Sequence, residues 1–384
     1  MDLSDAQPVQ LTLRVLAREQ IDAALIEQWE HLEQRSLEPN AFLSPHFIIP
    51  ALEHLTPDLQ VDIVAVGGGA GQLLGLGIFC RQRPTRQMPL PRLCAYRSPH
   101  SYRTGLLIDR TFSDCVADAF VGYFGQARNR WRAVEFVDLR LDGPLDRALL
   151  GAARRQGVRW KSYHEKTRAI LEPARCGAFE RSQRVHDAAE LRRKRRRLGE
   201  RGTVSWRLAI GAEVGPDQTE QLLALEHSGW KGEQRESLLS QPAHAQFCRD
   251  MAERFRRAGR VFFCELMVDG RVIASANYLL SGNVGFAFKI GWDPVYAKAS
   301  PGVLNEVEFI EHVGERLGTL EYIDSGAQPG SFIDALWPQR ATLGTRALLG
   351  RGIPAAFDPL LDALRAIKAR WRAVRAAMPR PGGR

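Results

Sequence analysis

Three consecutive segments between residues 261 and 292 have the length and composition of β-strands and are separated only by short turns. The first two, Val261–Val268 and Val272–Leu280, are joined by Asp269-Gly270, a dipeptide typical of tight hairpins. A second turn that contains glycine leads into the third segment, Val284–Trp292. Strands joined by such short turns pair antiparallel, so this stretch predicts a three-stranded meander.

The elements on either side of the meander narrow the fold class. Residues 241–258 predict a helix, whose apolar face carries Ala243, Phe247, Met251 and Phe255. After the meander, Ser300-Pro301-Gly302 opens a second helix, where the missing N–H of proline has no helical partner to lose. Leu320–Asp324 then has strand character. A helix, three antiparallel strands, a helix and a strand together predict an α+β domain.

Four short segments resemble the motif series of one acetyltransferase group. They are Asn40–Pro45, Leu225–Gly232, Phe286–Asp293 and Ser300–Leu304. These segments are similar to those of the CelD-like acetyltransferases, which belong to the GNAT superfamily and are associated with cellulose and exopolysaccharide biosynthesis. That group is related to the FemAB peptidyltransferases, which carry two GNAT units in tandem. The resemblance covers roughly residues 38–348 and is most specific between residues 222 and 305.

The first half of the chain predicts the same order of elements as the second. Helical stretches at 21–35 and 45–55 precede strands at 61–66 and 73–80, candidate strands near 93 and 105–108, a helix at 112–127, a strand at 134–139, a helix at 145–156 and an extended segment at 158–171. We therefore expect two tandem GNAT-like domains, each a mixed, mostly antiparallel sheet flanked by helices. The expected divisions are 1–175, a catalytic 176–350, and a basic amphipathic helix with a loose tail at 351–384.

Composition argues against several other classes of protein. The chain is 45% hydrophobic and 25% charged, which is ordinary for a globular protein. Its most apolar stretch, Val61 to Cys80, is interrupted by the glycine-rich residues 67–71 and predicts two strands rather than a membrane span. Six scattered cysteines without a CxxC pair argue against a disulfide framework or a zinc site. We expect a cytoplasmic protein without a metal.

The net charge of +9 is concentrated in two segments. One is the run Arg192–Arg197, in which every residue is basic, and the other is residues 351–384. The run has three interpretations: a solvated helix face, a contact with anionic substrate, or RNA binding. No aromatic residue interleaves it, which disfavours nucleic acid. The amphipathic stretch 358–378 either packs on the body or contacts an anionic membrane.

The start of the helix after Ser300 is the candidate site for an acyl donor. A helix N-terminus offers unpaired N–H groups and a positive dipole end, which suit a diphosphate. In GNAT proteins this junction holds coenzyme A, so the resemblance implies acetyl-CoA or another acyl-CoA as co-substrate here, although the usual Gly-x-Gly pair is absent. The expected donor-binding residues are Ile290, Gly291, Trp292, Ser300, Gly302, Val303 and Leu304.

Other residues are candidates for acceptor binding and catalysis. Trp230, Lys231 and Lys289 are the expected substrate contacts; Lys289 interrupts an apolar strand, which costs free energy unless the ammonium meets an anion or solvent. Strand alternation places Phe286, Phe288 and Ile290 on one face and Lys289 on the other. An attacking amine or hydroxyl must lose a proton, for which Glu226 and Asp324 are candidate bases and Tyr296 is a candidate acid.

The sequence therefore predicts an acyltransferase, with a saccharide or small molecule as acceptor. The resemblance implies an acetyl group moved to an amine or hydroxyl in polysaccharide or cell-envelope synthesis, by direct attack, with backbone N–H groups near residues 290–292 stabilising the oxyanion. Two alternatives stay open. One is aminoacyl transfer from tRNA, as in FemAB relatives, and the other is a non-catalytic GNAT-like scaffold.

Overall fold

A computed structural model of the chain describes residues 10–85, 88–126, 131–179 and 188–351, with three single positions beyond them. The first half contributes β1 (Thr12–Leu16), α1 (Ala23–Gln34), α2 (Pro45–Pro50), β2 (Val61–Gly67), β3 (Leu73–Gln82), β4 (Arg92–Ala95), β5 (Leu107–Ile108), α3 (Ser113–Gly125), β6 (Ala133–Arg140), α4 (Pro144–Arg155) and β7 (Arg159–Leu171). Apart from positions 359 and 363, the helix expected at 358–378 lies outside the described residues.

The second half repeats this order after a connecting segment. It contributes α5 (Pro173–Phe179), α6 (Ala188–Gly199), β8 (Val204–Ile210), α7 (Gln218–Ser228), α8 (Trp230–Glu233), α9 (Pro242–Arg257), β9 (Val261–Val268), β10 (Arg271–Ser281), β11 (Val284–Trp292), η8 (Pro294–Ala299), α10 (Pro301–Leu317), β12 (Tyr322–Asp324), α11 (Phe332–Leu336) and β13 (Gln339–Leu349). In the first half β2, β3 and β4 pair antiparallel, and β4 then pairs in parallel with β6, which follows α3 in the chain. In the second half β9, β10 and β11 pair antiparallel, and β11 pairs in parallel with β12, which follows α10. This confirms the expected α+β class and the tandem plan.

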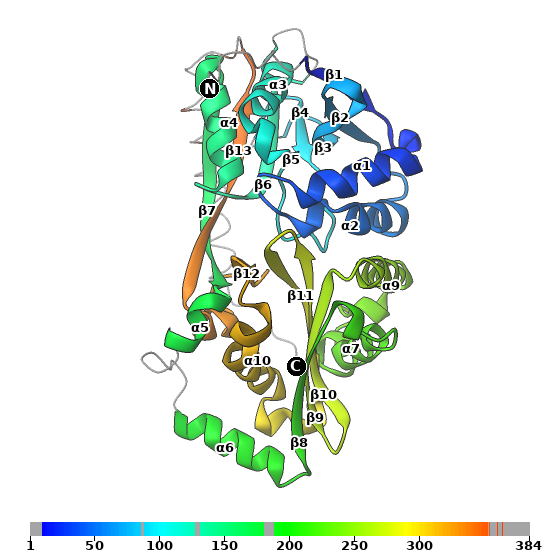
Figure 1. Cartoon of the computed structure of the whole chain (residues 1–384), viewed down its shortest axis with the longest axis vertical. Coiled ribbons are helices and arrows are strands. Elements are labelled where there is room, and N and C mark those ends of the chain that lie inside the picture. Colours follow the sequence, from blue (N-terminus) through cyan, green and yellow to red (C-terminus); the bar gives the residue numbers. More distant parts are fainter. Residues whose placement is uncertain are drawn as a thin grey trace, which may run out of the picture.

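The two halves form one mixed sheet rather than two separate ones. Its strand order is β1-β2-β3-β4-β6-β13-β7-β12-β11-β10-β9-β8 (Figure 1). The last strand of the second half, β13, lies between β6 and β7, and the last strand of the first half, β7, lies between β13 and β12. Each half thus lends its final strand to the other. The sheet runs unbroken across the division expected at residue 175, and β13 was not anticipated from the sequence.

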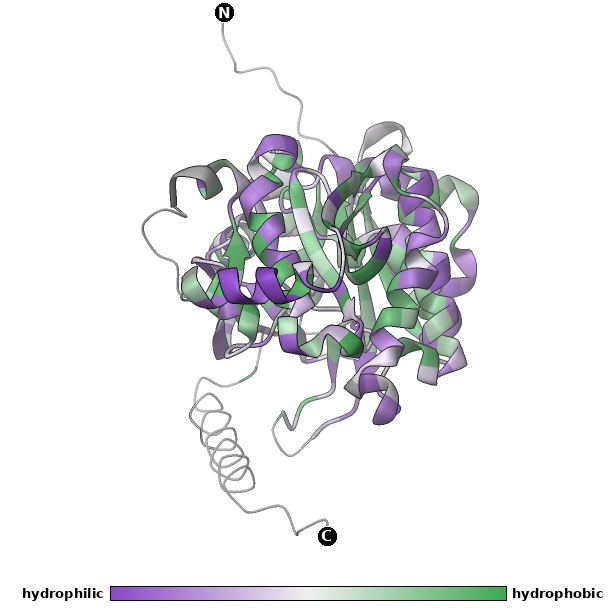
Figure 2. Cartoon of the chain, turned by 90° about the horizontal axis from the view of Figure 1, so that it is seen from below, coloured by the Kyte–Doolittle hydropathy of each residue, from purple (hydrophilic) through white to green (hydrophobic). Residues whose placement is uncertain are grey.

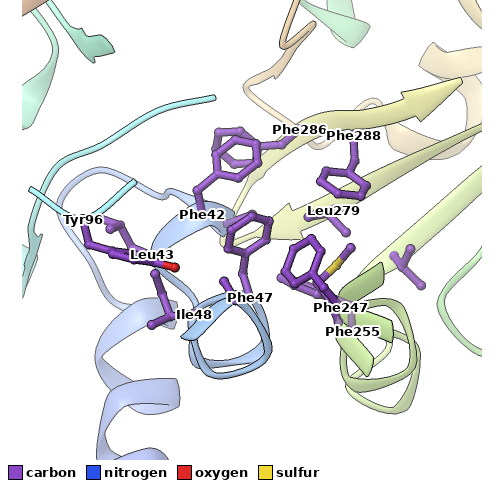
Figure 3. Packing of buried hydrophobic residues seen from close by; sticks show 14 of the residues in the cluster. Phe42, Leu43, Phe47, Ile48, Tyr96, Phe247, Phe255, Leu279, Phe286 and Phe288 are labelled. Atoms are coloured by element: carbon purple, nitrogen blue, oxygen red, sulfur yellow. The ribbon is translucent and has the colours of Figure 1, made fainter. Parts of the chain in front are cut away.

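The helices cover the two faces of this sheet differently. On one face α1, α2, α7 and α9 share a single hydrophobic core that continues from the first half into the second. Figure 3 shows its centre, where Phe42 and Phe47 of the first half meet Phe247 and Phe286 of the second. The ring centroids of Phe47 and Phe247 lie 5.3 Å apart, edge to face. On the opposite face α3 and α4 cover the first half and α10 covers the second, each with a core of its own.

A buried ionic cluster joins the halves where β12 meets β7. The guanidinium of Arg103, in the loop between β4 and β5, bonds to Glu38 of the first half and to the Tyr322 hydroxyl of β12 (3.0 Å). Asp324, at the end of β12, lies 3.9 Å from Arg103 and 3.5 Å from Arg168 of β7. All these side chains are almost fully buried. Polar groups therefore fix the orientation of the halves in addition to the shared apolar core.

The distribution of hydropathy matches these layers. Hydrophobic residues lie on the strands and the inward helix faces, whereas hydrophilic residues lie on the outer helix faces (Figure 2). In the described part of the chain, no helix has the length and apolar content needed to cross a membrane.

Candidate functional site

The pocket that we take as the functional site lies where β11 and β12 separate. They pair in parallel only from Val284 to Phe286, because β12 ends at Asp324 while β11 continues to Trp292. The space beyond the last pair is a pocket of about 220 Å³. It is lined by Tyr102, Lys231, Ala276, Tyr278, Ala287, Phe288, Lys289, Ile290, Glu306, Ser325, Gly326, Ala327, Ser331, Phe332 and Ile333. The lining includes residues from both faces of the sheet.

An irregularity in β11 determines which side chains enter this pocket. In the ladder with β10, Asn277 pairs with Lys289 but the next residue, Tyr278, pairs with Ala287, so Phe288 is an extra residue. The bulge shifts the alternation beyond it. Phe288 stays in the core on the α7 and α9 face, whereas Ile290 packs against the α10 face. The prediction that Phe286, Phe288 and Ile290 share one face is therefore wrong for Ile290. It is also wrong for Lys289, which was expected on the other face but lies beside Phe288 and His100 on the α7 and α9 face.

Two lysines line the part of the pocket nearest α7 and α9. Lys231, on α8, donates to Glu226 (2.9 Å). Lys289 donates to the Tyr102 hydroxyl (3.0 Å) and to Nδ1 of His100 (3.3 Å), both in the loop after β4. Burial lowers the pKa of Lys289, but the neighbouring Tyr102 and Glu226 raise it above its ordinary value. Both predicted lysines thus lie at the pocket, and the side chain of Trp230 lies outside the described residues.

On the α10 face the pocket contains a buried carboxyl group, Glu306. It accepts hydrogen bonds from the Tyr278 hydroxyl (2.7 Å) and from Nε1 of Trp337 (3.3 Å). Burial raises the pKa of Glu306 to about 7, although both hydrogen bonds act in the opposite direction. Burial also raises the pKa of Tyr278 well above its ordinary value, so this phenol stays protonated. A carboxyl that titrates near neutral pH at a pocket is suited to take up and release a proton.

The three catalytic candidates from the sequence lie outside the lining. Glu226 is buried and accepts from Lys231 and from the Leu238 N–H (2.9 Å), so it fixes Lys231. Asp324 belongs to the ionic cluster with Arg103 and Arg168 and also caps the Gly326 N–H (2.9 Å). Tyr296, in η8, packs against the core under α6. Each contributes to structure near the site, and none of them touches the pocket.

The start of α10 is more closed than the sequence suggested. Ser300 has a left-handed backbone, with a φ of 50°. Its carbonyl accepts from the amides of both Val303 (3.0 Å) and Leu304 (3.1 Å). Pro301 and Gly302 are buried, and a Cβ on Gly302 would meet the Trp292 ring at 3.2 Å. Since proline has no N–H, only the Gly302 amide of this turn is left to face a ligand. Of the predicted donor-binding residues, Ile290 alone lines the pocket.

Positive charge is nevertheless close to this helix start, on α6. Leu191 and Leu198 of α6 pack with Ala299 and Leu304 in one cluster. The guanidinium of Arg197 donates to the Lys298 carbonyl (3.2 Å), two residues before Ser300. Arg195 pairs with Glu308 and Glu311 of α10. The basic run is thus a largely exposed face of a packed helix, and Arg197 places its positive charge near the N-terminus of α10.

A tight turn after β12 forms the wall opposite Lys289. Gly326 has a φ of 62°, a left-handed conformation that favours glycine. A Cβ at this position would lie 2.7 Å from the Tyr102 ring and 3.0 Å from the Ala287 carbonyl oxygen. Glycine therefore lets the turn approach β11 closely enough to bound the pocket.

Comparisons with known proteins agree with this geometry. Residues 185–332 match the family model described as an acetyltransferase (GNAT) domain. This part of the chain is a GNAT-type acetyltransferase domain. It gives the protein the transferase class of activity, and the pocket lies within the GNAT domain apart from Tyr102 and Ile333. A search of curated protein sequences found no match.

Three solved structures share the fold over nearly the whole chain. FemX is 10% identical with a TM-score of 0.54, covering 88% of this chain and 97% of that one. The C-terminal domain of a protein assigned as a lysylphosphatidylglycerol synthetase from Agrobacterium fabrum is 15% identical with a TM-score of 0.50, covering 89% and 94%. A conserved protein of unknown function from Bacteroides thetaiotaomicron is 11% identical with a TM-score of 0.53, covering 86% and 98%. Identities this low establish the fold alone.

Proposed function

We propose that this protein transfers an acyl group from acyl-CoA to an amine or hydroxyl of an acceptor bound between β11 and β12. The observation that carries the proposal is Glu306, a buried carboxyl at the pocket of a GNAT-type domain with a pKa raised to about 7. The pocket crosses the sheet, with lysines near one face and Glu306 near the other. Donor and acceptor can therefore approach from opposite faces and meet at the gap.

The proposed reaction is a direct acyl transfer. The nucleophilic nitrogen or oxygen of the acceptor adds to the thioester carbonyl carbon and gives its proton to the Glu306 carboxylate. The carbon–sulfur bond then breaks, and the thiolate takes a proton from the pocket. The source of this proton is Glu306, and the hydroxyl of Tyr278, which bonds to Glu306 and lines the pocket, can relay it to the thiolate. Tyr278 would recover its proton from Glu306, so neither residue changes over a cycle.

The donor would bind on the α10 face. There Ile290 lies 3.7 Å from the position of a Cβ on Gly302, so the pocket and the helix start are neighbours. The turn offers few free amides, and Arg197 provides charge for phosphates beside it. The same surface favours a second candidate donor, an aminoacyl-tRNA, because Arg192, Arg193 and Arg196 on α6 are exposed.

The acceptor that we propose comes from cell-envelope or polysaccharide synthesis. The resemblance to CelD-like enzymes supports an acceptor from polysaccharide or cell-envelope synthesis, and the reaction would take place in the cytoplasm. A scaffold without catalysis is the competing function, which the pocket chemistry disfavours because a scaffold has no need of a buried carboxyl that titrates near neutral pH.

Calorimetry of the full chain with acetyl-CoA, longer acyl-CoAs and aminoacyl-tRNA, run in parallel, tests the donor. We expect saturable binding of one acyl-CoA, and release of free thiol when an acceptor is present. Tight, salt-sensitive binding of aminoacyl-tRNA alone would replace the CoA donor with the second candidate. If neither donor binds, the scaffold function is supported and the enzyme proposal fails.

A further inference from the structure

Lys289 is a positive charge held at the pocket by neutral groups. In the described part of the chain, no carboxylate lies within ion-pair distance of its Nζ atom. Its contacts are the Tyr102 hydroxyl at 3.0 Å, Nδ1 of His100 at 3.3 Å, and the rings of Phe288 and Tyr102, whose centroids lie 5.1 and 5.7 Å away. Removing an ammonium from water without a counter-ion costs free energy. A bound anion would offset this cost by supplying the missing counter-ion.

The two histidines beside Lys289 fix its position without adding charge. Nε2 of His100 lies 3.1 Å from Nδ1 of His244, and the His100 ring stacks on Phe247 at 5.6 Å. Burial and the charge of Lys289 lower the pKa of His100 to about 3, and the same two causes lower that of His244. Both rings are neutral, so the Nδ1 of His100 accepts from Lys289 while its Nε2–H donates to His244.

One hydrogen-bond donor of Lys289 is left for a ligand. An ammonium has three N–H groups, and the contacts above use two of them, toward Tyr102 and His100. Tyr102 in turn donates to the Phe288 carbonyl (3.1 Å), so its single O–H is already used and it meets Lys289 as an acceptor. The third N–H has no hydrogen-bond partner among the described residues, and Lys289 is one of the residues that line the pocket. The chain therefore holds the ammonium in place and leaves one of its bonds unmade.

The net charge of the side chains around Lys289 suits a ligand that carries one negative charge. The charge of Lys231 is cancelled by Glu226, whose other oxygen accepts from the Leu238 amide. The histidines are neutral, which leaves Lys289 as the net +1 of this end. A monoanion such as a carboxylate balances it, whereas a phosphate dianion would exceed it.

We propose that Lys289 binds a carboxylate of the acceptor, and that the acceptor is an amino-acid-like molecule whose amine receives the acyl group. This inference rests on the acyl transfer proposed above and names its substrate class. Lys289 lies on the α7 and α9 face, opposite the donor side, and a pocket of about 220 Å³ suits a small acceptor. The carboxylate at Lys289 would direct the amine toward the gap in the sheet.

The test compares each standard L-amino acid with its carboxamide, which keeps the amine and removes the negative charge. Binding is measured by thermal shift and calorimetry without any donor, and turnover by thiol release with the acyl-CoA that binds. We expect at least one amino acid to bind about tenfold or more tightly than its carboxamide, in line with a charge-assisted hydrogen bond. Lys289→Met should remove that preference and leave carboxamide binding nearly unchanged.

Three further variants make the result specific. Lys289→Arg retains the charge and should restore part of the preference. Lys289→Gln retains a donor for Tyr102 and loses the charge, so it serves if the Met variant fails to fold. Arg257→Met removes an exposed positive charge of α9 that lies outside the pocket lining, and it should behave as wild type.

The outcomes separate this inference from the proposed function. If acyl-CoA binds and is turned over but no carboxylate is preferred, or if Lys289→Met weakens acids and carboxamides equally, the carboxylate site is overturned and the acyltransferase stands. If a Lys289-dependent preference for carboxylates is found but no acyl donor binds, the site stands and the acyl transfer is overturned.

Discussion

Glu306 illustrates how much a single buried group can define a site. It lies on the inward face of α10 together with Phe309, Ile310 and Val313, all of them in one hydrophobic cluster. A carboxyl in such surroundings is easily protonated, and Tyr278 and Trp337 hold it in one orientation. Its pKa of about 7 follows from the cost of burying the charge, which the two hydrogen bonds only partly offset.

Glu306→Gln should reduce kcat by about 10²- to 10⁴-fold, the range typical of removing a general base. The amide oxygen still accepts from Tyr278, so the fold should be retained. In the wild type, kcat/KM should rise with pH through about 7 as Glu306 loses its proton. Rates of thiol release between pH 5 and 9 check both statements. A variant with wild-type kcat would exclude Glu306 as the base.

The same substitution should change how stability depends on pH. Because the pKa in the fold is about 7 against an ordinary 4.5, the wild type loses stability as pH rises between these values, by roughly 3 kcal/mol in total. Glutamine does not titrate, so this loss should be absent. Urea unfolding at pH 4.5 and 8 measures it: the stability of Glu306→Gln relative to wild type must increase with pH, and a constant difference contradicts the raised pKa.

Gly326→Ala should both strain the chain and narrow the pocket. The new Cβ would press on the Tyr102 ring and the Ala287 carbonyl, in a backbone with a φ of 62°. Gly330→Ala is a matched control, since its φ is 81° but nothing lies within 4 Å of the new Cβ. Both variants should lose roughly 1 kcal/mol to backbone strain. Only Gly326→Ala should also raise the KM of the acceptor, by about tenfold or more, and equal KM values would disprove the contact.

Among single residues, the sequence revealed some parts of the site and concealed others. Lys289 could be found because a lysine interrupts an otherwise apolar strand. Glu306 was equally visible as a carboxylate on the apolar stripe of a helix, but it was not singled out. His100, His244 and Tyr102 are brought to Lys289 only by tertiary structure, since they lie 45 or more residues from it in the chain, and no local pattern encodes that proximity.

At the scale of elements, local patterns predicted most of the fold. Val261–Val268 and Val284–Trp292 are strands with the expected ends, and the predicted helices lie within a few residues of α1 to α4, α9 and α10. The helices α5, α7, α8 and α11 were not predicted. The wrong assignment of faces in β11 comes from its bulge. The prediction assumed that side chains alternate regularly along the strand, and the extra residue Phe288 interrupts that alternation. The edge strands β1 and β8 were missed. In β8 the signal was present, because Val204, Trp206, Leu208 and Ile210 alternate with polar or small residues as in a strand.

The position of α6 against the start of α10 predicts a role in donor binding. Arg197→Gln removes the guanidinium beside Lys298 and should weaken acyl-CoA binding roughly three- to tenfold, with a smaller effect at high salt. Arg196→Gln is the control, because Arg196 lies on the same helix, is exposed and faces Glu200. Calorimetry with acyl-CoA at 50 and 500 mM salt compares the two variants. Equal effects of both substitutions on the affinity would show that α6 has no specific role in donor binding.

For the whole molecule, the decisive feature is that neither half is complete alone. β7 and β13 are each shared between the halves, the core around Phe47 and Phe247 is continuous, and Arg103 of the first half meets Asp324 of the second. β13 could not be predicted because Arg340, Thr342, Thr345 and Arg346 interrupt its apolar residues. Its partners, β6 and β7, lie far away in the chain, and long-range pairing leaves no local signal.

Arg103→Met should destabilise the entire chain rather than one half. It would leave Glu38 and Asp324 buried with less positive charge, for which about 3–5 kcal/mol is typical. Arg155→Met, at an exposed arginine of α4, should leave the unfolding midpoint nearly unchanged. Urea unfolding followed by tryptophan fluorescence and by circular dichroism should show one coincident transition that shifts for Arg103→Met. Two separate transitions would contradict the shared sheet.

The exchange of final strands also affects how the protein is made. When the first half leaves the ribosome, the place between β6 and β7 is empty, because the segment that fills it, residues 339–349, is translated after the twelve other strands described. Open strand edges of this kind attract other chains. The nascent polypeptide therefore has to keep two unpaired edges apart until residues 339–349 have been made, a period in which chaperones would protect it.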